Sequence, residues 1–324
     1  MKVALIIVYN HRFDKNIERI ETLLKNKFSN IYHIIPFYDG NKKNVITVYE
    51  SSWFFSGYIA QAYEKIKNEN FTHFIFTADD MIINPNINEN NFLEQIGLKN
   101  NESFIPGFIE FGNNNKETWR RIGEAMGYNP YIKYNGAEIK SILPNYIEAQ
   151  NLFIKHNLKN SFEIPYKKAL KNFTKDLFKE SYYYTSKSIL AKLIKHPFSK
   201  YKLEYPLAVS YTHLRAHETV LEYPLVGSYS DFFITTADIM PKFCQYCGAF
   251  AATNLFVEIA IPTALVLAAP KIKTEKDTIL KGTPFWGDEI EKECQKYNYE
   301  LTELLSKFPS GQLYHHPVKL SKWK

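Results

Sequence analysis

Apolar runs and helix-spaced apolar positions alternate along the first forty residues of the chain. KVALIIVY (2–9) is a continuous, largely β-branched run, which is typical of a strand buried in a parallel sheet. Residues 10–28 carry apolar side chains three or four positions apart, the spacing of a helix that buries one face. NIYHIIPFYDG (30–40) predicts a second strand that ends in a turn.

The same alternation continues to residue 98. SSWFFSGYIAQAYEKIKNE (51–69) predicts a helix capped by Ser51 or Ser52, and THFIFTADD (72–80) predicts a third apolar strand. A short helix is expected at 90–98. Strands that alternate with helices favour an α/β fold with a mostly parallel, Rossmann-like central sheet flanked by helices. Such sheets bind ligands at the carboxyl ends of their strands.

The remainder of the chain is less regular. Its apolar patterning predicts strands or extended chain at 104–111, 230–236 and 311–323, and helices at 145–158, 239–253 and 254–269.

The net charge of +6 is unevenly distributed. Residues 166–202 hold ten lysines against only Asp176 and Glu180, so the rest of the chain is slightly acidic. Two interpretations of this basic segment stay open: a solvated helical hairpin, or a dock for an anionic membrane surface. Nucleic acid is not expected as a partner, because arginine is scarce there and no nucleic-acid-binding motif accompanies the lysines.

Hydropathy and cysteine content narrow the class of protein. The start of the chain predicts a strand rather than a signal peptide, since no small-residue cleavage site follows the apolar run. The longest apolar run, 255–269, is shorter than the roughly 20 residues that a membrane span needs. Three cysteines, two of them in the C-x-x-C of 244–247, make neither a disulfide framework nor a zinc ribbon, and we expect structural thiols. We expect a cytoplasmic protein, peripheral on the inner face of the membrane if 166–202 is a dock.

Two adjacent carboxylates, Asp79 and Asp80, stand where the third apolar strand ends. Uncompensated acids at a buried strand end are costly unless a cation or a hydrogen-bonding ligand satisfies them. Hard divalent cations need such oxygen ligands, and Mg²⁺ commonly shares its coordination shell with substrate phosphates. The pattern favours a metal site; the alternative is a solvated turn or an acidic cap on the next helix.

The stretch FTHFIFTADDMIINP (71–85) resembles the metal-binding strand of GT-A-fold bacterial glycosyltransferases, which ends in an acidic D-x-D-like motif. In that family the acids hold Mn²⁺ or Mg²⁺ against the diphosphate of a nucleotide sugar. The order of elements in the N-terminal half is similar to that of the family, although T-A-D-D replaces a D-x-D. The resemblance implies a GT-A-like fold and transfer of a sugar from a nucleotide sugar to a glycan or lipid-linked acceptor, in surface polysaccharide synthesis.

The resemblance also implies roles for residues at the strand ends. Asp79 and Asp80 would hold the metal and the sugar diphosphate. Tyr9 and Asn10, after the first strand, would line the nucleotide pocket, and Asp39 would contact the base or ribose.

Further candidates lie on the acceptor side and in the tail. Glu258, in an apolar helix, is expected to have a pKa raised by burial and to act as the general base, with Asp231 as its rival. A core carboxylate is the alternative role for Glu258. In LYHHPVKLSKW (313–323), His316 is a candidate metal ligand and Lys319 a candidate partner of phosphate; the alternative is a surface strap.

PFWGDEIE (284–291) places Trp286 beside two acids, an arrangement that suits either stacking of a sugar ring or the start of a capped helix. Two other functions stay open. A nucleotidyltransferase would need a glycine-rich phosphate loop after the first strand, where VYNHRFDKN (8–16) has no glycine. A non-catalytic nucleotide- or sugar-binding relative is the other.

The spacing H-x-x-x-H-E at His213, His217 and Glu218 looks like the beginning of a metal motif. In a zincin helix, however, the glutamate follows the first histidine, and here it follows the second. The intervening LRA has no clear helical context, so no metal site is predicted there.

VSYTHLRAHET (209–219) is instead similar, over all eleven residues, to a translation of the transposase adapter used in sequencing libraries. A copy of LEYPL flanks it on each side, at 203–207 and 221–225. Excision of 208–225 restores the run KLEYPLVGSYSDFF. We therefore expect an artefactual insertion that forms a poorly packed surface loop.

These assignments divide the chain into four segments. Residues 1–135 form the predicted nucleotide-sugar-binding half, and 136–202 a helical basic insertion. Residues 203–225 are the predicted artefactual stretch, and 226–324 the acceptor-side half with a C-terminal strap.

Overall fold

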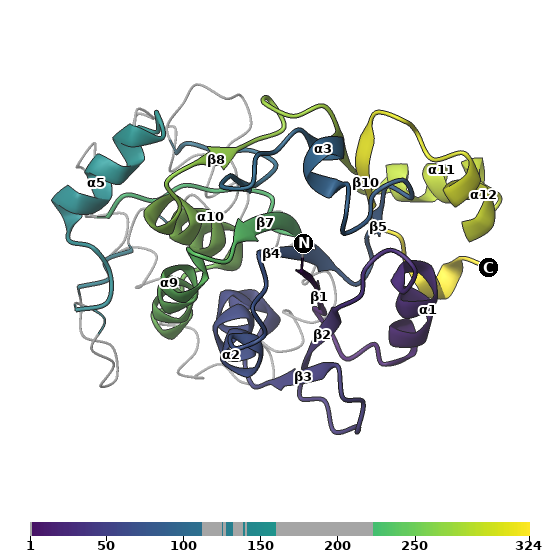
Figure 1. Ribbon diagram of the computed structural model, residues 1–324, viewed down its shortest axis with the longest axis horizontal. Coiled ribbons are helices and arrows are strands. Elements are labelled where there is room, and N and C mark those ends of the chain that lie inside the picture. Colours follow the sequence, from purple (N-terminus) through teal and green to yellow (C-terminus); the bar gives the residue numbers. More distant parts are fainter. Residues whose placement is uncertain (1, 112–124, 126–127, 132–138, 140, 160–222) are drawn as a thin grey trace, which may run out of the picture. The chain divides into compact units, whose positions relative to one another are not determined.

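Figure 1 shows a computed structural model of the chain, which describes residues 2–111, 125, 128–131, 139, 141–159 and 223–324. The predictions made for the basic segment 166–202 and for the adapter-like stretch 209–219 lie outside these residues. The chain groups into two compact units, the first of Met1–Ile109, Tyr134–Leu143 and Gly227–Lys324, and the second of Glu110–Lys133 and Pro144–Val226. All the candidate site residues belong to the first unit.

A seven-stranded sheet in the order β3-β2-β1-β4-β7-β6-β8 forms the centre of the first unit. Neighbouring strands are parallel except around β7, which is antiparallel to both β4 and β6. The predicted α/β class, with a mostly parallel central sheet, is confirmed. The strands are β1 (Val3–Val8), β2 (Ile31–Pro36), β3 (Val45–Val48), β4 (His73–Ala78), β6 (Ser103–Phe104), β7 (Phe232–Thr236) and β8 (Ile272–Lys273).

The register of the central strands brings the ends of β1 and β4 and the start of β7 to one edge of the sheet. All six positions of β1 and of β4 are buried, and the two strands pair in parallel from Val3 with His73 to Val8 with Ala78. They therefore end together, and the residues that follow them emerge side by side. Because β7 runs the other way, the residue before it reaches the same edge, where the Ala78 N–H donates to the Asp231 carbonyl at 3.0 Å.

Helices cover both faces of this sheet (Figure 1). Apolar residues of α1, α3 and α12 belong to the same core as Val3, Leu5 and Ile7. On the other face, Phe243 of α9 packs against Phe233, whose chain neighbour Phe232 faces the first core, as the two-residue period of a strand requires. The helices of this unit are α1 (Lys15–Leu24), α2 (Ser56–Ile66), α3 (Phe92–Ile96), α9 (Met240–Ala252), α10 (Val257–Ala268), α11 (Asp288–Lys296) and α12 (Leu301–Ser306).

A small second sheet fastens the C-terminal tail to the loop after β4. Its order is β5 (Ile82–Ile83), β10 (Gln312–His316) and β9 (Lys281–Pro284), with β10 antiparallel to β5 and parallel to β9. The register of β10 on β9 shifts between Gln312 and His315, as at a β-bulge. Beyond β10, the Val318 N–H donates to the Asp80 carbonyl at 2.5 Å, which holds the tail against the acidic turn.

The second unit contains α5 (Tyr146–Lys155), which begins with a capping box between Asn145 and Glu148. Tyr223, in the second copy of LEYPL, is fully buried in this unit, and its hydroxyl donates to the Pro144 carbonyl at 3.1 Å. Leu225 of the same copy is also buried. Residues 223–225 of this copy are therefore a packed part of the fold.

Several predicted boundaries are wrong. The expected helix at 51–69 is split at Phe55, because Ser51 caps a separate 3-10 turn (Ser52–Phe54) before α2 begins. The expected strand at 104–111 is limited to β6 and a single bridge at Ile109, and β3 was not predicted. Among the described residues, the longest and most apolar helices still fall short of what crossing a bilayer requires.

The three cysteines are free and buried, Cys244 and Cys247 in α9 and Cys294 in α11. Desolvation by burial raises the pKa of both α9 thiols, which disfavours the reactive thiolate. These features agree with the expected structural thiols.

Candidate functional site

Four of the predicted site residues meet at the edge where β1 and β4 end. Asp79 and Asp80 follow β4, Asp231 precedes β7, and His316 is the last residue of β10. The His316 Nε2–H donates to Asp80 Oδ1 at 2.9 Å, and the charges of Asp79 and Asp231 also act on this imidazole. The site thus combines residues that are separated by more than two hundred positions in the sequence.

Asp79 is the least exposed of the three aspartates, with 6% of the residue accessible to solvent. Asn16, in the first turn of α1, donates its Nδ2–H to Asp79 Oδ2 at 2.8 Å. Burial, with the nearby charge of Asp80, nevertheless raises the pKa of Asp79 to about 7. This carboxylate is therefore short of neutralising partners at neutral pH.

Hydrogen bonds join Asp80 to Tyr229 through His316, and Tyr229 acts in turn on Asp231. His316 contacts Asp80 through Nε2, and its Nδ1 is in hydrogen-bond contact with the Tyr229 hydroxyl. The Tyr229 hydroxyl also interacts with the Asp231 carboxylate and opposes the rise of its pKa. Two strand ends and the C-terminal tail are therefore coupled through one connected polar network.

The pKa shifts in this network follow from burial and from the three negative charges. Burial alone would lower the pKa of His316, but the hydrogen bond and charge of Asp80, with Asp231 and Asp79, outweigh it and raise that pKa. Asp231 keeps some exposed surface, yet protein surrounds its carboxyl group closely enough that desolvation raises its pKa. A carboxylate with a raised pKa is a better proton acceptor near neutral pH.

The carboxylates of Asp79 and Asp80 fit a hard divalent cation that completes its shell with water and phosphate oxygens. Burial is the main cause of the raised pKa of Asp79, so a cation bound nearby would stabilise its charged form. Within the part of the chain that the structure describes, no three acidic, histidine or cysteine side chains are arranged as a ready-made ligand set. His316 in particular uses both ring nitrogens in contacts with Asp80 and Tyr229.

A small pocket opens at the same edge, and its polar lining residues beyond the strands are Asn10, Ser230 and Asp231. The remaining lining residues come from the ends of β1 and β4 and from the starts of α2 and β7: Val8, Phe55, Phe76, Thr77, Ala78 and Phe233. Asn10 is exposed, and its predicted contact with a nucleotide stays a prediction. Asn10 and Asp231 line the same pocket.

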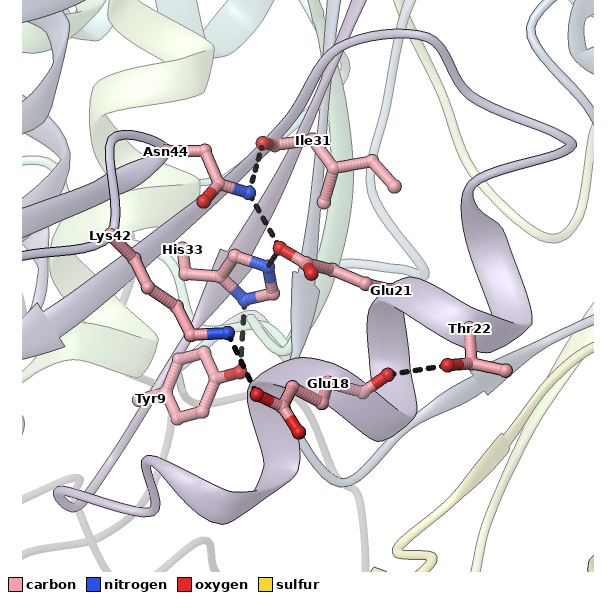
Figure 2. A network of polar contacts seen from close by, with 8 residues as sticks. All are labelled: Tyr9, Glu18, Glu21, Thr22, Ile31, His33, Lys42 and Asn44. Atoms are coloured by element: carbon pink, nitrogen blue, oxygen red, sulfur yellow. Dashed lines mark hydrogen bonds and ion pairs between the residues drawn. The ribbon is translucent and has the colours of Figure 1, made fainter.

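Tyr9 was expected in the same pocket, and the structure places it elsewhere. Its side chain is fully buried, since it continues the inward-facing positions Leu5 and Ile7 of β1. Its hydroxyl contacts His33 Nδ1 at 2.9 Å, and Figure 2 shows how His33 in turn faces Glu21 of α1. Tyr9 therefore serves the packing of α1 on the sheet.

The residues in Figure 2 form a polar network that ties α1 to the loop before β3. Asn44 Nδ2 donates to Glu21 Oε1 at 2.7 Å, and Lys42 forms an ion pair with Glu18 at 3.2 Å. Burial lowers the pKa of His33 to about 4, despite the nearby charge of Glu21. His33 is therefore a neutral imidazole at physiological pH.

Asp39 and Lys319 are exposed near the site rather than enclosed in it. Asp39 lies in the loop after β2, with 77% of its side chain exposed, and it pairs with Arg12 of the loop after β1. That hydrogen bond lowers the pKa of Asp39. Lys319 is exposed and directly follows Val318, whose backbone is bonded to Asp80. Both side chains are accessible to a ligand at this edge.

Glu258 occupies the first turn of α10 and is half-buried, so the apolar helix does not enclose it as expected. Its backbone carbonyl accepts a hydrogen bond from Ser228 at 2.9 Å. Asp231, the rival candidate base, belongs to the polar network of the site.

Tyr229 and Asn16 are site residues that no sequence motif marks. Tyr229 stands two positions before Asp231, so strand alternation would have placed both side chains on the same side. No comparable signal marks Asn16, because its contact with Asp79 depends on how α1 packs on the sheet.

Comparisons of the chain with models of protein families, with curated proteins and with solved structures find no match. The site is therefore interpreted from its own chemistry.

Proposed function

We propose that the protein is a glycosyltransferase that moves a sugar from a nucleotide-sugar donor to a hydroxyl group of a glycan or lipid-linked acceptor. The observation that carries this proposal is the meeting of Asp79, Asp80 and Asp231 at the carboxyl edge of the central strands. Ligands of open α/β sheets bind at that edge. Three partly desolvated carboxylates there suit a site for a cation and a diphosphate on one side and an acceptor hydroxyl on the other.

In this proposal Asp79 and Asp80 face the donor. Bound with the donor, Mn²⁺ or Mg²⁺ would supply positive charge against the leaving diphosphate. Lys319, exposed beside the tail that is fixed to Asp80, would add a further positive charge for the phosphates. Asn10 would hydrogen-bond the donor in the pocket that it lines, and Asp39 would meet the base or ribose.

Asp231 is the proposed general base. As the acceptor oxygen forms its bond to the anomeric carbon, the bond from that carbon to the diphosphate breaks, and the nucleoside diphosphate leaves with the electron pair. The proton of the acceptor hydroxyl passes to the Asp231 carboxylate. The raised pKa of Asp231 suits this transfer, and the Tyr229 hydroxyl that acts on this carboxylate would orient it.

Titration calorimetry of the full chain with UDP-, GDP-, CDP- and dTDP-sugars, each with and without Mn²⁺, tests the donor half of this proposal. We expect one nucleotide class to bind, and Mn²⁺ to strengthen that binding. Binding of none of them, with or without metal, would refute the proposal. Donor binding without transfer or hydrolysis, in the presence of a panel of acceptors, would favour a non-catalytic nucleotide-binding protein.

The matched variants Asp231→Asn and Asp238→Asn test the acceptor half. Asp231 precedes β7, whereas Asp238 is an exposed residue just beyond the opposite end of that strand. We expect Asp231→Asn to lose about a hundredfold or more in transfer rate with unchanged donor binding, and Asp238→Asn to behave as wild type. Equal transfer rates in both variants would exclude Asp231 as the base.

A further inference from the structure

We propose that Trp286 is the stacking residue for a saccharide ring of the acceptor. This inference rests on the proposed function and names the acceptor's chemical class: a neutral saccharide whose ring lies on the indole. Three observations support it: where the chain holds Trp286, what its ring touches, and how much of the ring stays open to solvent.

The loop that carries Trp286 is fixed to the site by the backbone. β9 pairs in parallel with β10, with Pro284 opposite His316, and the Phe285 N–H donates to the His316 carbonyl at 2.8 Å. The next residue is Trp286, and its own N–H donates to Glu289 Oε2 at 3.3 Å. Gly287 then turns the chain into α11 with a φ of +57°, a conformation that favours glycine. Trp286 is thus held at the strand end next to His316.

The indole ring contacts the polar network at Tyr229. The two ring centroids are 6.3 Å apart and the rings are nearly perpendicular, at 84°. Tyr229 is the residue whose hydroxyl contacts His316 and acts on the Asp231 carboxylate. The indole is therefore separated by one aromatic ring from the carboxylate that we propose as the base.

Despite this contact, Trp286 is 63% exposed. The indole is large, rigid and open to solvent, and Tyr229 contacts it. Binding a ligand on such a ring buries apolar surface and costs little side-chain conformational entropy. A pyranose ring has a matching apolar face of C–H groups and a rim of hydroxyl groups. Stacked on Trp286, a saccharide would bury its apolar face and direct its rim towards the Tyr229–Asp231 end of the network.

Trp53 provides an internal comparison. It is also exposed, at 44%, but its ring packs on Phe256 with centroids 4.9 Å apart, and it belongs to the 3-10 turn before α2. It has the same chemistry as Trp286 and no contact with Tyr229 among the ring pairs of the described residues. Trp53 is therefore a matched control for the effect of removing an exposed indole.

The test uses the full chain with lactose, maltose and chitobiose as probes, and measures tryptophan emission together with calorimetry. We expect at least one disaccharide to bind and to change the emission. Trp286→Ala should weaken that binding by about tenfold. Trp286→Phe should retain the affinity within about threefold, since it keeps an aromatic face, but lose the emission change. Trp53→Ala should retain both the affinity and the emission change.

Three results would overturn the inference: no disaccharide binds the wild-type protein, Trp286→Ala binds as tightly as wild type, or the emission change persists in Trp286→Phe. Thermal melting of each variant verifies that it is folded. Donor binding by calorimetry separates the two proposals. A protein that binds a nucleotide sugar but no disaccharide refutes only the role of Trp286, whereas one that binds no nucleotide sugar refutes the proposed function itself.

Discussion

His33 and His316 have closely similar neighbours, and their pKa values shift in opposite directions. Each histidine has a tyrosine hydroxyl at Nδ1 and a carboxylate at Nε2: Tyr9 and Glu21 around His33, Tyr229 and Asp80 around His316. Burial lowers the pKa of His33 to about 4, whereas the pKa of His316 is raised.

The difference comes from the distance and the number of the negative charges. Glu21 Oε1 is 3.4 Å from His33 Nε2, which has no hydrogen-bond partner among the described residues, and the charge of Lys42 opposes the Glu21 effect. His316 Nε2 instead donates to Asp80 at 2.9 Å, and two further carboxylates add to the effect. The same three residue types therefore make a neutral structural contact at His33, whereas at His316 the surrounding carboxylates favour the protonated imidazole.

The largest effect is expected from removing the carboxylate that contacts His316. Asp80→Ala should lower the pKa of His316 towards the behaviour of His33, and should reduce the transfer rate about a hundredfold to a thousandfold. Glu21→Gln, the corresponding change at His33, should leave the transfer rate unchanged. NMR titration of the histidines and steady-state rates measure both effects. Metal-dependent hydrolysis of the donor that survives Asp80→Ala would contradict the role of Asp80.

The second-largest effect is expected on the pH dependence of the free energy of unfolding. His33 has a pKa of about 4 in the folded protein, below its ordinary value near 6.5. Between these two pH values the unfolded chain therefore binds a proton at His33 that the folded chain does not bind. The free energy of unfolding should fall between pH 6.5 and 4, by at most about 3 kcal/mol from this group. For His316 the sign is reversed: its raised pKa contributes stability below pH 6.5, which is lost as the pH rises through the folded pKa.

Urea unfolding from pH 4.5 to 8 measures these contributions, because subtraction of each variant from wild type cancels the carboxylates that titrate in the same range. His33→Gln should have a flatter stability profile than wild type on the acid side. His316→Gln should instead remove stability chiefly on the acid side. Identical pH slopes in wild type and His33→Gln would contradict the neutral, buried state of His33.

The two tyrosines offer a smaller and closely matched test. Tyr9→Phe removes the hydroxyl from His33 Nδ1 and should cost about 1 kcal/mol of stability, because a buried nitrogen loses its partner, with no change in transfer rate. Tyr229→Phe removes the hydroxyl from His316 and Asp231 and should reduce the transfer rate about tenfold. Chemical unfolding and steady-state rates distinguish the two outcomes. Equal effects of the two variants on rate would mean that the two histidine sites do not differ in function.

The smallest effect is expected from deleting the adapter-like insertion. Because LEYPL is repeated, removal of 208–225 and removal of 203–220 produce the same sequence, and the copy that packs through Tyr223 can keep its place. The pH profile of stability, the transfer rate and the melting temperature of the shortened chain should match those of the parent. A melting temperature lower by about 5 °C or more would mean that the inserted residues contribute to the fold.

The strands that carry the site could be predicted because each is rich in apolar and β-branched residues. β1, β4 and β7 were found in this way, and Asp79 and Asp80 could be recognised as acids at a buried strand end. β3 was missed because Val45–Val48 spans only four residues, too short for a pattern to stand out. Its position beside β2 depends on pairing with a neighbour that the local sequence does not reveal.

The composition of the site was harder to predict because it depends on tertiary packing. Strand alternation, applied one residue past β1, would have put Tyr9 in the core and Asn10 outside. In contrast, no local pattern could show that Asn16 reaches Asp79, or that the tail brings His316 to Asp80. Contacts between segments so distant in sequence are decided by how the elements pack.

The two adjacent histidines of β10 make the site sensitive to strand register. His315 is buried among Phe285, Tyr297 and Phe308, whereas His316 faces Asp80. A slip of one residue would exchange two identical side chains, so imidazole chemistry alone cannot distinguish the correct alignment from the incorrect one. The alignment is instead enforced by apolar neighbours such as Leu313, which is completely buried. A mutation at this aliphatic residue is therefore expected to disable the polar centre without touching it, by misaligning the strand that delivers its histidine.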